Sequence, residues 1–329
     1  MENTSKNTPP TARFQFFPVS LFGSIFGFSG LTLAFKNATG ILNINEKVTL
    51  ALTLLTTLIL LSVTAVYLLK IIKHRSSVIA EFCHPVAMNF FPAYTISLML
   101  LSVLYIPIYK PLAIGLFYIG ASGHVILTVY IMQTWLLHDK WNIQQMTPAW
   151  FIPIVGNIVA PIAVVNFAPM EISWFFFSIG LVFWFVLQVI VMYRLFFHPP
   201  MPKVLEPTLF ILIAPPAIGF VSYQAMHPGL PLDGFARILY YTALFYTLLL
   251  GSQFLRFIKI PFAVSWWAYT FPLSAIASAS FIMYEKLQIN LFAFIGTFIL
   301  AILSALVLYL TFKTLLAIKK KQLCVPPSV

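Results

Sequence analysis

Ten apolar stretches separated by short polar segments follow one another along almost the whole chain. They cover roughly residues 14–35, 47–72, 86–106, 111–137, 148–168, 171–197, 207–226, 233–257, 262–284 and 289–318. Most reach the roughly 20 apolar residues that a helix needs to cross the hydrocarbon core of a bilayer. Only 8% of the residues are charged and 60% are hydrophobic, whereas soluble domains carry roughly a quarter charged residues. The sequence therefore predicts an all-α membrane protein of ten transmembrane helices.

The charged residues predict how these helices are oriented. Fourteen lysines and arginines fall on the side that holds both chain ends, and five fall on the other side. Because positively charged loops stay in the cytoplasm, we expect a multi-pass membrane protein with both termini inside. Its expected location is the inner (plasma) membrane of a bacterium. The net charge of +11 is explained by this bias and does not indicate nucleic acid as a partner. The whole chain, 1–329, is expected to be a single transmembrane domain with short cytoplasmic tails, 1–13 and 319–329.

One proline recurs in every second apolar stretch. The intervals of 74, 61, 62 and 57 residues are close to the length of one helical hairpin. The five prolines are Pro18, Pro92, Pro153, Pro215 and Pro272. Such a repeat predicts five similar hairpins arranged in a quasi-five-fold ring around a central pore. Each proline is expected to kink an inner helix and to free the carbonyl four residues before it, which would face the ring interior or a packed neighbour.

The residues that precede the five prolines are candidates for a constriction of that pore, because they should lie at a common depth. They are Phe17, Phe91, Ile152, Ala214 and Phe271. Large apolar side chains at one level can block a pore sterically and by dewetting. The alternative is that these side chains pack between helices, because hydropathy does not determine how a helix is rotated.

The sequence lacks the motifs of soluble enzymes and of metal or cofactor sites. It has no HExxH, no GxxxxGK[ST], no GxGxxG opening a helix and no Cys/His metal spacing. The chain is therefore expected not to be an enzyme, and to bind no metal and no cofactor. The eight acidic residues fall in loops or at span ends, so His124 is the one titratable side chain expected near mid-membrane, as a structural histidine or as a proton relay. Glu81 either starts a helix or guards the cytoplasmic mouth of the pore.

The sign of the transported ion does not follow from these residues. Freed carbonyl oxygens would suit a cation, whereas the cytoplasmic lysines would favour an anion but are already explained by the orientation rule.

Four segments resemble one known family over essentially the whole chain. They are EFCHPVAMNFFP (81–92), TPAWFIPIVG (147–156), IAPPAIGF (213–220) and SWWAYTFPLS (265–274). The chain is similar to the family of the bacterial tellurite-resistance protein TehA, which includes plant guard-cell slow anion channels, a yeast malate permease and fungal sulfite exporters. Pro272, Phe17 and Phe91 depart from the TehA pattern, which leaves the tightness of the gate open.

The resemblance implies a homotrimer with one pore in each protomer, formed by five inner helices. Phe271 matches the phenylalanine that plugs the pore in that family. The implied function is an anion channel that passes small monovalent anions, so the expected partners are small inorganic anions and membrane lipid. The alternative that the resemblance leaves open is a facilitated or proton-coupled exporter or permease for sulfite, tellurite or C4-dicarboxylates.

Overall fold

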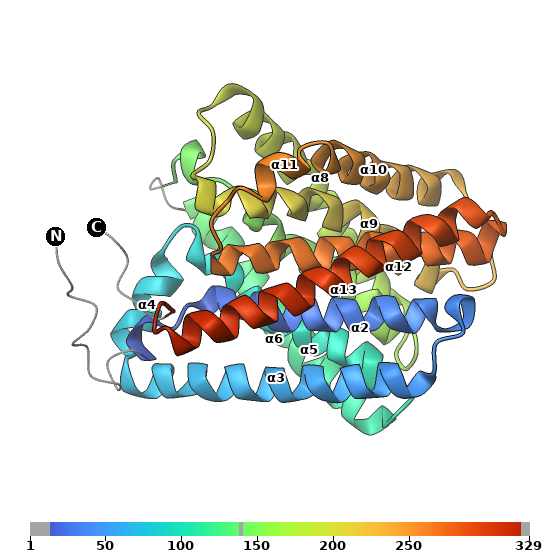
Figure 1. Ribbon diagram of the computed structural model, residues 1–329, viewed down its shortest axis with the longest axis horizontal. Helices are drawn as coiled ribbons and strands as arrows, with labels where there is room; N and C mark the ends of the chain where they lie inside the picture. The colour runs from blue at the N-terminus through green and yellow to red at the C-terminus, as the bar shows by residue number, and fades with distance from the viewer. Residues whose placement is uncertain (1–13, 138–140, 324–329) are drawn as a thin grey trace.

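The computed structural model describes residues 14–137 and 141–323, and every regular element within them is helical (Figure 1). The predicted tail 1–13 and the last six residues of the predicted tail 319–329 lie outside the described residues. The longer elements are α2 (Phe22–Leu42), α3 (Glu46–Lys73), α5 (Pro92–Tyr105), α6 (Lys110–Leu137), α7 (Ile152–Val164), α8 (Met170–Phe197), α9 (Ala214–Met226), α10 (Gly234–Gly251), α12 (Thr270–Leu287) and α13 (Asn290–Lys319). The shorter ones, in which η marks a 3-10 helix, are η2 (Phe14–Phe16), η3 (Val19–Leu21), α4 (Arg75–Cys83), η4 (Ala87–Phe90), η5 (Ile143–Gln145), η6 (Pro148–Phe151), η7 (Lys203–Ile213), α11 (Phe254–Phe257) and η8 (Val264–Tyr269).

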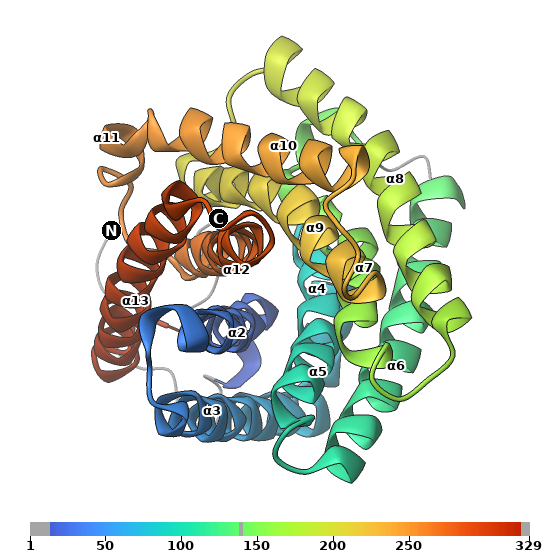
Figure 2. The same cartoon turned by 90° about the vertical axis from the view of Figure 1, so that its right-hand side faces the viewer.

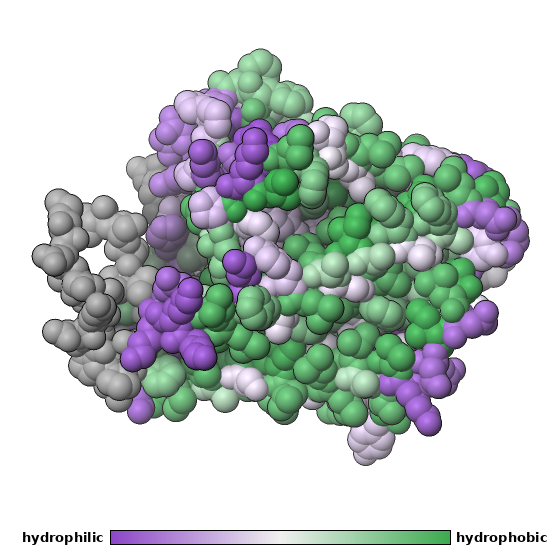
Figure 3. Space-filling model, in the orientation of Figure 1, coloured by the Kyte–Doolittle hydropathy of each residue, from purple (hydrophilic) through white to green (hydrophobic). Residues whose placement is uncertain are grey.

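Helices lie over all the apolar stretches that the sequence marks, and the class of the protein, an α-helical membrane protein, agrees with the prediction. Eight helical segments in the described residues are long and apolar enough to cross a bilayer, and the apolar segment Pro148–Val164 is shorter. Ten membrane crossings therefore stay a prediction. Figure 3 shows that apolar residues cover the middle of one face, with polar residues gathered toward its two ends, as expected where lipid tails surround the middle.

The helices fall into an inner and an outer set. Figure 2 shows α3, α6, α8, α10 and α13 on the outside of α2, α5, α7, α9 and α12. Each inner helix packs against the outer helix that follows it in the chain, and the inner helices also contact one another in the order α2, α5, α7, α9, α12 and back to α2. In the most apolar windows, 72–78% of the residues are buried for the inner segments around α2, α5 and α9, against 22–33% for the five outer helices.

The recurring prolines lie where helical segments begin, and the kinks predicted at them stay a prediction. Pro92, Pro153, Pro215 and Pro272 each occupy one of the first three positions of an α-helix that continues a 3-10 segment, and Pro18 caps the start of η3. A proline is tolerated there because the first turn of a helix has no internal partner for its N–H groups.

Four of the carbonyls expected to be free have a partner in the same segment. In each case the N–H of the residue just before the proline donates to the carbonyl three residues earlier. The pairs are Phe17 to Phe14, Phe91 to Met88, Ile152 to Ala149 and Ala214 to Ile211. The 3-10 geometry thus satisfies these groups without a pore. The expectation that the prolines leave these carbonyls free is therefore wrong for these four.

Two glycines, Gly27 and Gly30, allow α2 to pack closely on α12. A Cβ atom at Gly27 would lie 2.3 Å from Thr270 Oγ1, and one at Gly30 would lie 2.2 Å from Ser274 Oγ. A Cβ at Gly23 would lie 3.5 Å from the Cβ of Trp267, which is ordinary contact. Small residues spaced along one helix face let two backbones approach in a membrane. This close approach places the aromatic residues of α2 and α12 next to each other.

Candidate functional site

A small cavity of about 50 Å³ lies among the inner helices and the 3-10 segments that lead into them. Its lining comes from all five inner segments and carries no charged side chain. The lining residues are Ser20, Gly23, Phe26, Phe90, Ala93, Ile96, Phe151, Ile152, Val155, Gly156, Val159, Ile211, Ala214, Val264, Ser265, Trp267, Ala268, Phe271 and Pro272. A cavity of this volume holds a few water molecules at most. Narrow apolar spaces of this kind exclude water in channels that gate by dewetting.

Phe271 lines this cavity together with a second ring, that of Phe26, which the sequence did not single out. Its side chain is only 4% exposed. It stacks on Phe26 of α2, with 3.8 Å between ring centroids and 16° between ring planes. The glycine-lined contact between α2 and α12 makes this stack possible, because a Cβ at Gly30 would lie 3.2 Å from Phe271 Cδ2. The spacing of Gly23, Gly27 and Gly30 was the sequence signal that could have placed Phe26 opposite α12.

The five predicted constriction residues are only partly brought together. Ile152, Ala214 and Phe271 line the cavity, as does Pro272, but Phe17 and Phe91 do not.

The aromatic rings of Phe17 and Phe91 both lie against α3 or α4 instead. The ring of Phe17 faces Tyr67 at 6.4 Å between centroids, and the ring of Phe91 contacts Tyr67 and Phe82 at 6.1 and 4.8 Å. In η4 the preceding residue, Phe90, reaches the cavity. A 3-10 turn has three residues, so neighbouring side chains point roughly 120° apart, which separates Phe90 from Phe91.

His124 is fully buried behind the cavity wall. Its Nδ1 atom lies 2.9 Å from the hydroxyl oxygen of Thr95, and its Nε2 atom has no hydrogen-bond partner. Gly156, which lines the cavity, makes room for the imidazole, because a Cβ there would lie 2.3 Å from His124 Cε1. Within residues 14–137 and 141–323, no carboxylate contacts this histidine. The arrangement orients the ring but supplies no acidic partner for proton transfer.

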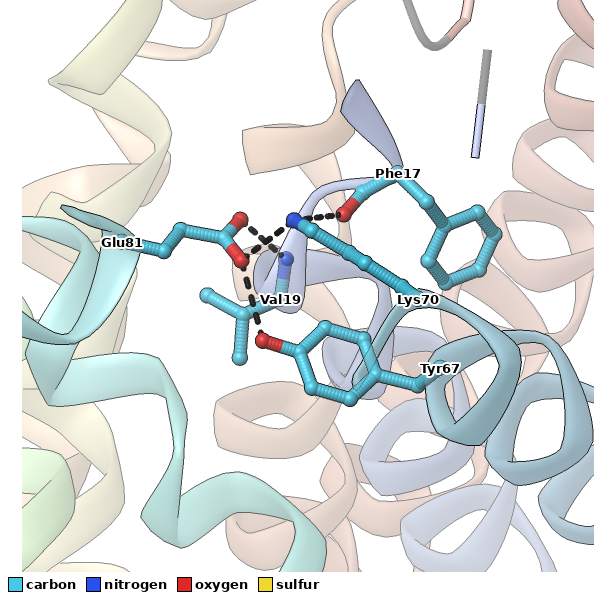
Figure 4. A network of polar contacts seen from close by, with 5 residues as sticks. All are labelled: Phe17, Val19, Tyr67, Lys70 and Glu81. Atoms are coloured by element: carbon cyan, nitrogen blue, oxygen red, sulfur yellow. Dashed lines mark hydrogen bonds and ion pairs between the residues drawn. The ribbon is translucent and has the colours of Figure 1, made fainter. Parts of the chain in front are cut away.

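Glu81 forms a partly buried polar network where the chain enters α2, as Figure 4 shows. Its Oε2 atom lies 2.6 Å from Lys70 Nζ and accepts a hydrogen bond from the Tyr67 hydroxyl at 2.9 Å. Its Oε1 atom accepts one from the backbone N–H of Val19 at 2.8 Å. Lys70 also donates to the carbonyl of Phe17 at 2.8 Å. The network joins α3, α4 and η3.

Glu81 itself does not line the cavity, but it holds the residue next to one that does, because Val19 precedes Ser20. In the sequence analysis Lys70 served only as one of the positive charges that orient the chain. In the structure its side chain is 2% exposed and lies beside Glu81. No group of three or more His, Cys, Asp or Glu side chains that could hold a metal ion occurs among the described residues.

Comparison with known proteins places this architecture in a family. Residues 16–315 match the family described as SLAC1, voltage-dependent anion channel. The chain is 31% identical to S-type anion channel SLAH2 of Arabidopsis thaliana over 80% of its own length and 52% of the relative's. It is 29% identical to the guard cell S-type anion channel SLAC1 of the same plant, over 82% of this chain and 50% of the relative. An uncharacterized transporter of Methanocaldococcus jannaschii is 26% identical over 70% of this chain and 74% of the relative. The chain thus spans about half the length of the plant relatives.

Proposed function

The chain belongs to the voltage-dependent anion channel family, and from this premise we propose that it is a channel for small monovalent anions, with a pore in each protomer that Phe271 occludes. The single observation that carries the proposal is the stack of Phe271 on Phe26 in an uncharged cavity lined by all five inner segments. A stacked pair of rings in so narrow a space excludes water and therefore ions.

The proposed architecture is ten spans in five hairpins, arranged as a quasi-five-fold ring around the pore in a single transmembrane domain. The cyclic order of contacts among α2, α5, α7, α9 and α12 supports the ring. The apolar, outward-facing α3, α6, α8, α10 and α13 support a lipid-facing outer layer. The lysine and arginine bias supports both termini in the cytoplasm, and the proposed location is a bacterial plasma membrane. Assembly as a homotrimer is proposed from the family resemblance.

Opening would require the two stacked rings to separate. Phe271 lies in the first turn of α12, directly before Pro272, so a rotation about the η8–α12 junction would move the ring relative to α2. Ile152 and Ala214 complete the proposed constriction from α7 and α9. The narrow pore would then fill with water over a length of a few residues, and an anion would cross without meeting a fixed charge in the cavity.

Removal of the ring tests this proposal. Phe271→Ala should give a chloride current in planar bilayers where the wild type is nearly silent, with little loss of thermal stability, because water can enter the space that the ring leaves. The matched control is Phe281→Ala in the same helix. Phe281 is fully buried against Gly296 of α13, so its loss should cost the roughly 3–5 kcal/mol typical of a dry core and give no current. An unstable, silent Phe271→Ala would refute the gate.

A facilitated or proton-coupled exporter or permease for sulfite, tellurite or a dicarboxylate is the second candidate. The observation in its favour is His124, whose Nε2 atom is buried without a hydrogen-bond partner behind Gly156 of the cavity wall. A histidine with a free ring nitrogen beside a substrate path could carry a proton. Proton-driven accumulation of sulfite or malate in proteoliposomes, lost in His124→Ala, would favour this candidate.

A further inference from the structure

A second, larger cavity lies at the other end of the same inner helices. Its volume is about 340 Å³, and its lining includes residues from the last turns of α2, α5, α9 and α12 and from the end of α7. From Phe26 to Leu33 along α2, and from Ala214 to Val221 along α9, the two cavities are seven residues apart. Seven residues of α-helix span about 10 Å. The larger cavity is therefore a mouth above the narrow one, at the end opposite Glu81.

The larger cavity differs from the narrow one in polarity. Its polar lining residues are Lys36, Asn37, Asn166, Gln224, Glu285 and Lys286. At about 30 Å³ for each water molecule, it has room for about ten of them. An ion could thus stay hydrated in this space and would lose its water only on entering the narrow cavity.

Lys36 supplies a positive charge and N–H donors to the lining of this mouth. It is a half-buried lysine of α2 whose Nζ atom donates to the carbonyl of Val103 at 3.2 Å. In the part of the chain that the structure describes, the ion pairs are Lys70 with Glu81 and Arg256 with Glu206, so no described carboxylate lies within 4.0 Å of Lys36. An ammonium group has three N–H donors, and Val103 takes one of them. The other donors are available to water or to an anion.

The remaining groups of the mouth leave it positively charged. Glu285 is exposed, and its charge is balanced in the lining by Lys286, whose Nζ atom donates to the carbonyl of Leu230 at 2.8 Å. The charge of Lys36 is therefore left over. Gln224 is only 7% exposed, and its Oε1 atom has no hydrogen-bond partner. This amide can hold a water molecule of a hydrated ion, and Asn37 lies beside Lys36 in the same lining.

We propose that Lys36, with the amides of Asn37 and Gln224, forms a binding site for a hydrated monovalent anion at this mouth. The site rests on the proposed function in that it would supply the narrow cavity with anions. It also accounts for the sign of the ion, which the sequence left open, because a cation would be repelled by Lys36 before it reached the uncharged constriction. Binding at the site does not require that the channel conduct.

The direct test is bromide binding to the purified full-length protein in detergent. Thermal unfolding is followed while sodium bromide replaces sodium gluconate at constant ionic strength, since a ligand that binds only the folded state raises the melting temperature. Bromide should stabilise the wild type. The apparent dissociation constant should rise at least tenfold in Lys36→Gln and change little in Lys36→Arg. The matched control is Lys47→Gln, which removes an exposed lysine at the start of α3, outside the cavity.

The possible outcomes distinguish a failure of the proposed anion-binding site from a failure of the proposed channel function. Bromide binding that depends on Lys36 supports the site even if no variant conducts. A chloride current through Phe271→Ala without bromide stabilisation of the wild type would overturn the site and leave the channel intact. Equal bromide effects in the wild type and in Lys36→Gln would also overturn it, because they would be general salt effects. If Lys36→Gln does not fold, Gln224→Leu decides instead, because it removes the amide of the site and keeps the charge of Lys36. A weaker apparent bromide affinity in Gln224→Leu supports the site, and an affinity equal to that of the wild type overturns it.

Discussion

Breaking the ion pair between Lys70 and Glu81 should destabilise the protein far more than breaking an ordinary surface pair. Lys70 is 2% exposed and Glu81 17% exposed, with 2.6 Å between Nζ and Oε2. At an effective dielectric constant of about 20, charges at that distance attract by about 6 kcal/mol, much of which is offset by the loss of hydration. In Glu81→Gln the amide can still accept from Val19, but the buried ammonium of Lys70 loses its counter-charge. We expect a destabilisation of about 3 kcal/mol, the lower end of the range for a broken buried pair.

A double-mutant cycle isolates this term. Lys70→Met should cost less than Glu81→Gln, because the remaining carboxylate is partly exposed and keeps its hydrogen bonds from Val19 and Tyr67. The double variant should be more stable than Glu81→Gln alone, because it no longer buries an unpaired charge. At roughly 2–4 °C for each kcal/mol, Glu81→Gln should lower the melting temperature in detergent by roughly 6–12 °C.

An exposed carboxylate provides the control for this prediction. Glu171→Gln removes an exposed carboxylate from the first turn of α8 and should change the melting temperature by only a degree or two. If the effects of Lys70→Met and Glu81→Gln simply add in the double variant, the two side chains are not coupled and the reasoning fails.

Two further predictions concern the packing of α2 and the accessibility of the proposed pore. Gly30→Ala should destabilise the protein by about 1–3 kcal/mol, because the added Cβ would overlap Ser274. The control, Gly40→Ala, has open space around it and should be neutral or stabilising by up to about 1 kcal/mol. Equal melting temperatures of the two variants would argue against the close contact of α2 with α12. In a cysteine-free Phe271→Ala background, Ala214→Cys should react with a water-soluble thiol reagent, and Val189→Cys, 71% exposed on the outer helix α8, should be protected by lipid. Equal labelling of the two positions would mean that the assignment of inner and outer helices is wrong.

The helices were largely predictable because, in a membrane protein, the limits of an apolar run indicate where a helix begins and where it ends. The stretches 47–72 and 171–197 became α3 and α8 to within one residue at each end. The first stretch was less well placed, since α2 continues to Leu42 through Lys36 and Asn37. Those polar residues are helical and line the larger cavity, where water can hydrate them. A hydropathy pattern cannot distinguish a polar residue that ends a span from one that faces a water-filled space.

The candidate site was predictable only in part, because hydropathy does not report how a helix is rotated. The resemblance pointed to Phe271, which does line the narrow cavity. The residues before all five repeat prolines were expected to line one constriction, but Phe17 and Phe91 face elsewhere. Phe26 was missed because it depends on how α2 is turned toward α12. The partner of Glu81 was missed because Lys70 lies 11 residues away on another helix, where a sequence gives no sign of contact.

The reversal potential of the Phe271→Ala variant tests most directly the claim that this chain is a passive anion channel. Purified protein in a planar bilayer is exposed to a tenfold chloride gradient, first at equal pH and then with a pH difference of one unit. The account predicts a current that reverses near the chloride equilibrium potential, about 59 mV from zero for a tenfold gradient, and that does not shift when the pH difference is imposed. A reversal potential that moves with the proton gradient, and returns to the chloride value in the Phe271→Ala/His124→Ala double variant, would contradict it and establish coupled transport instead.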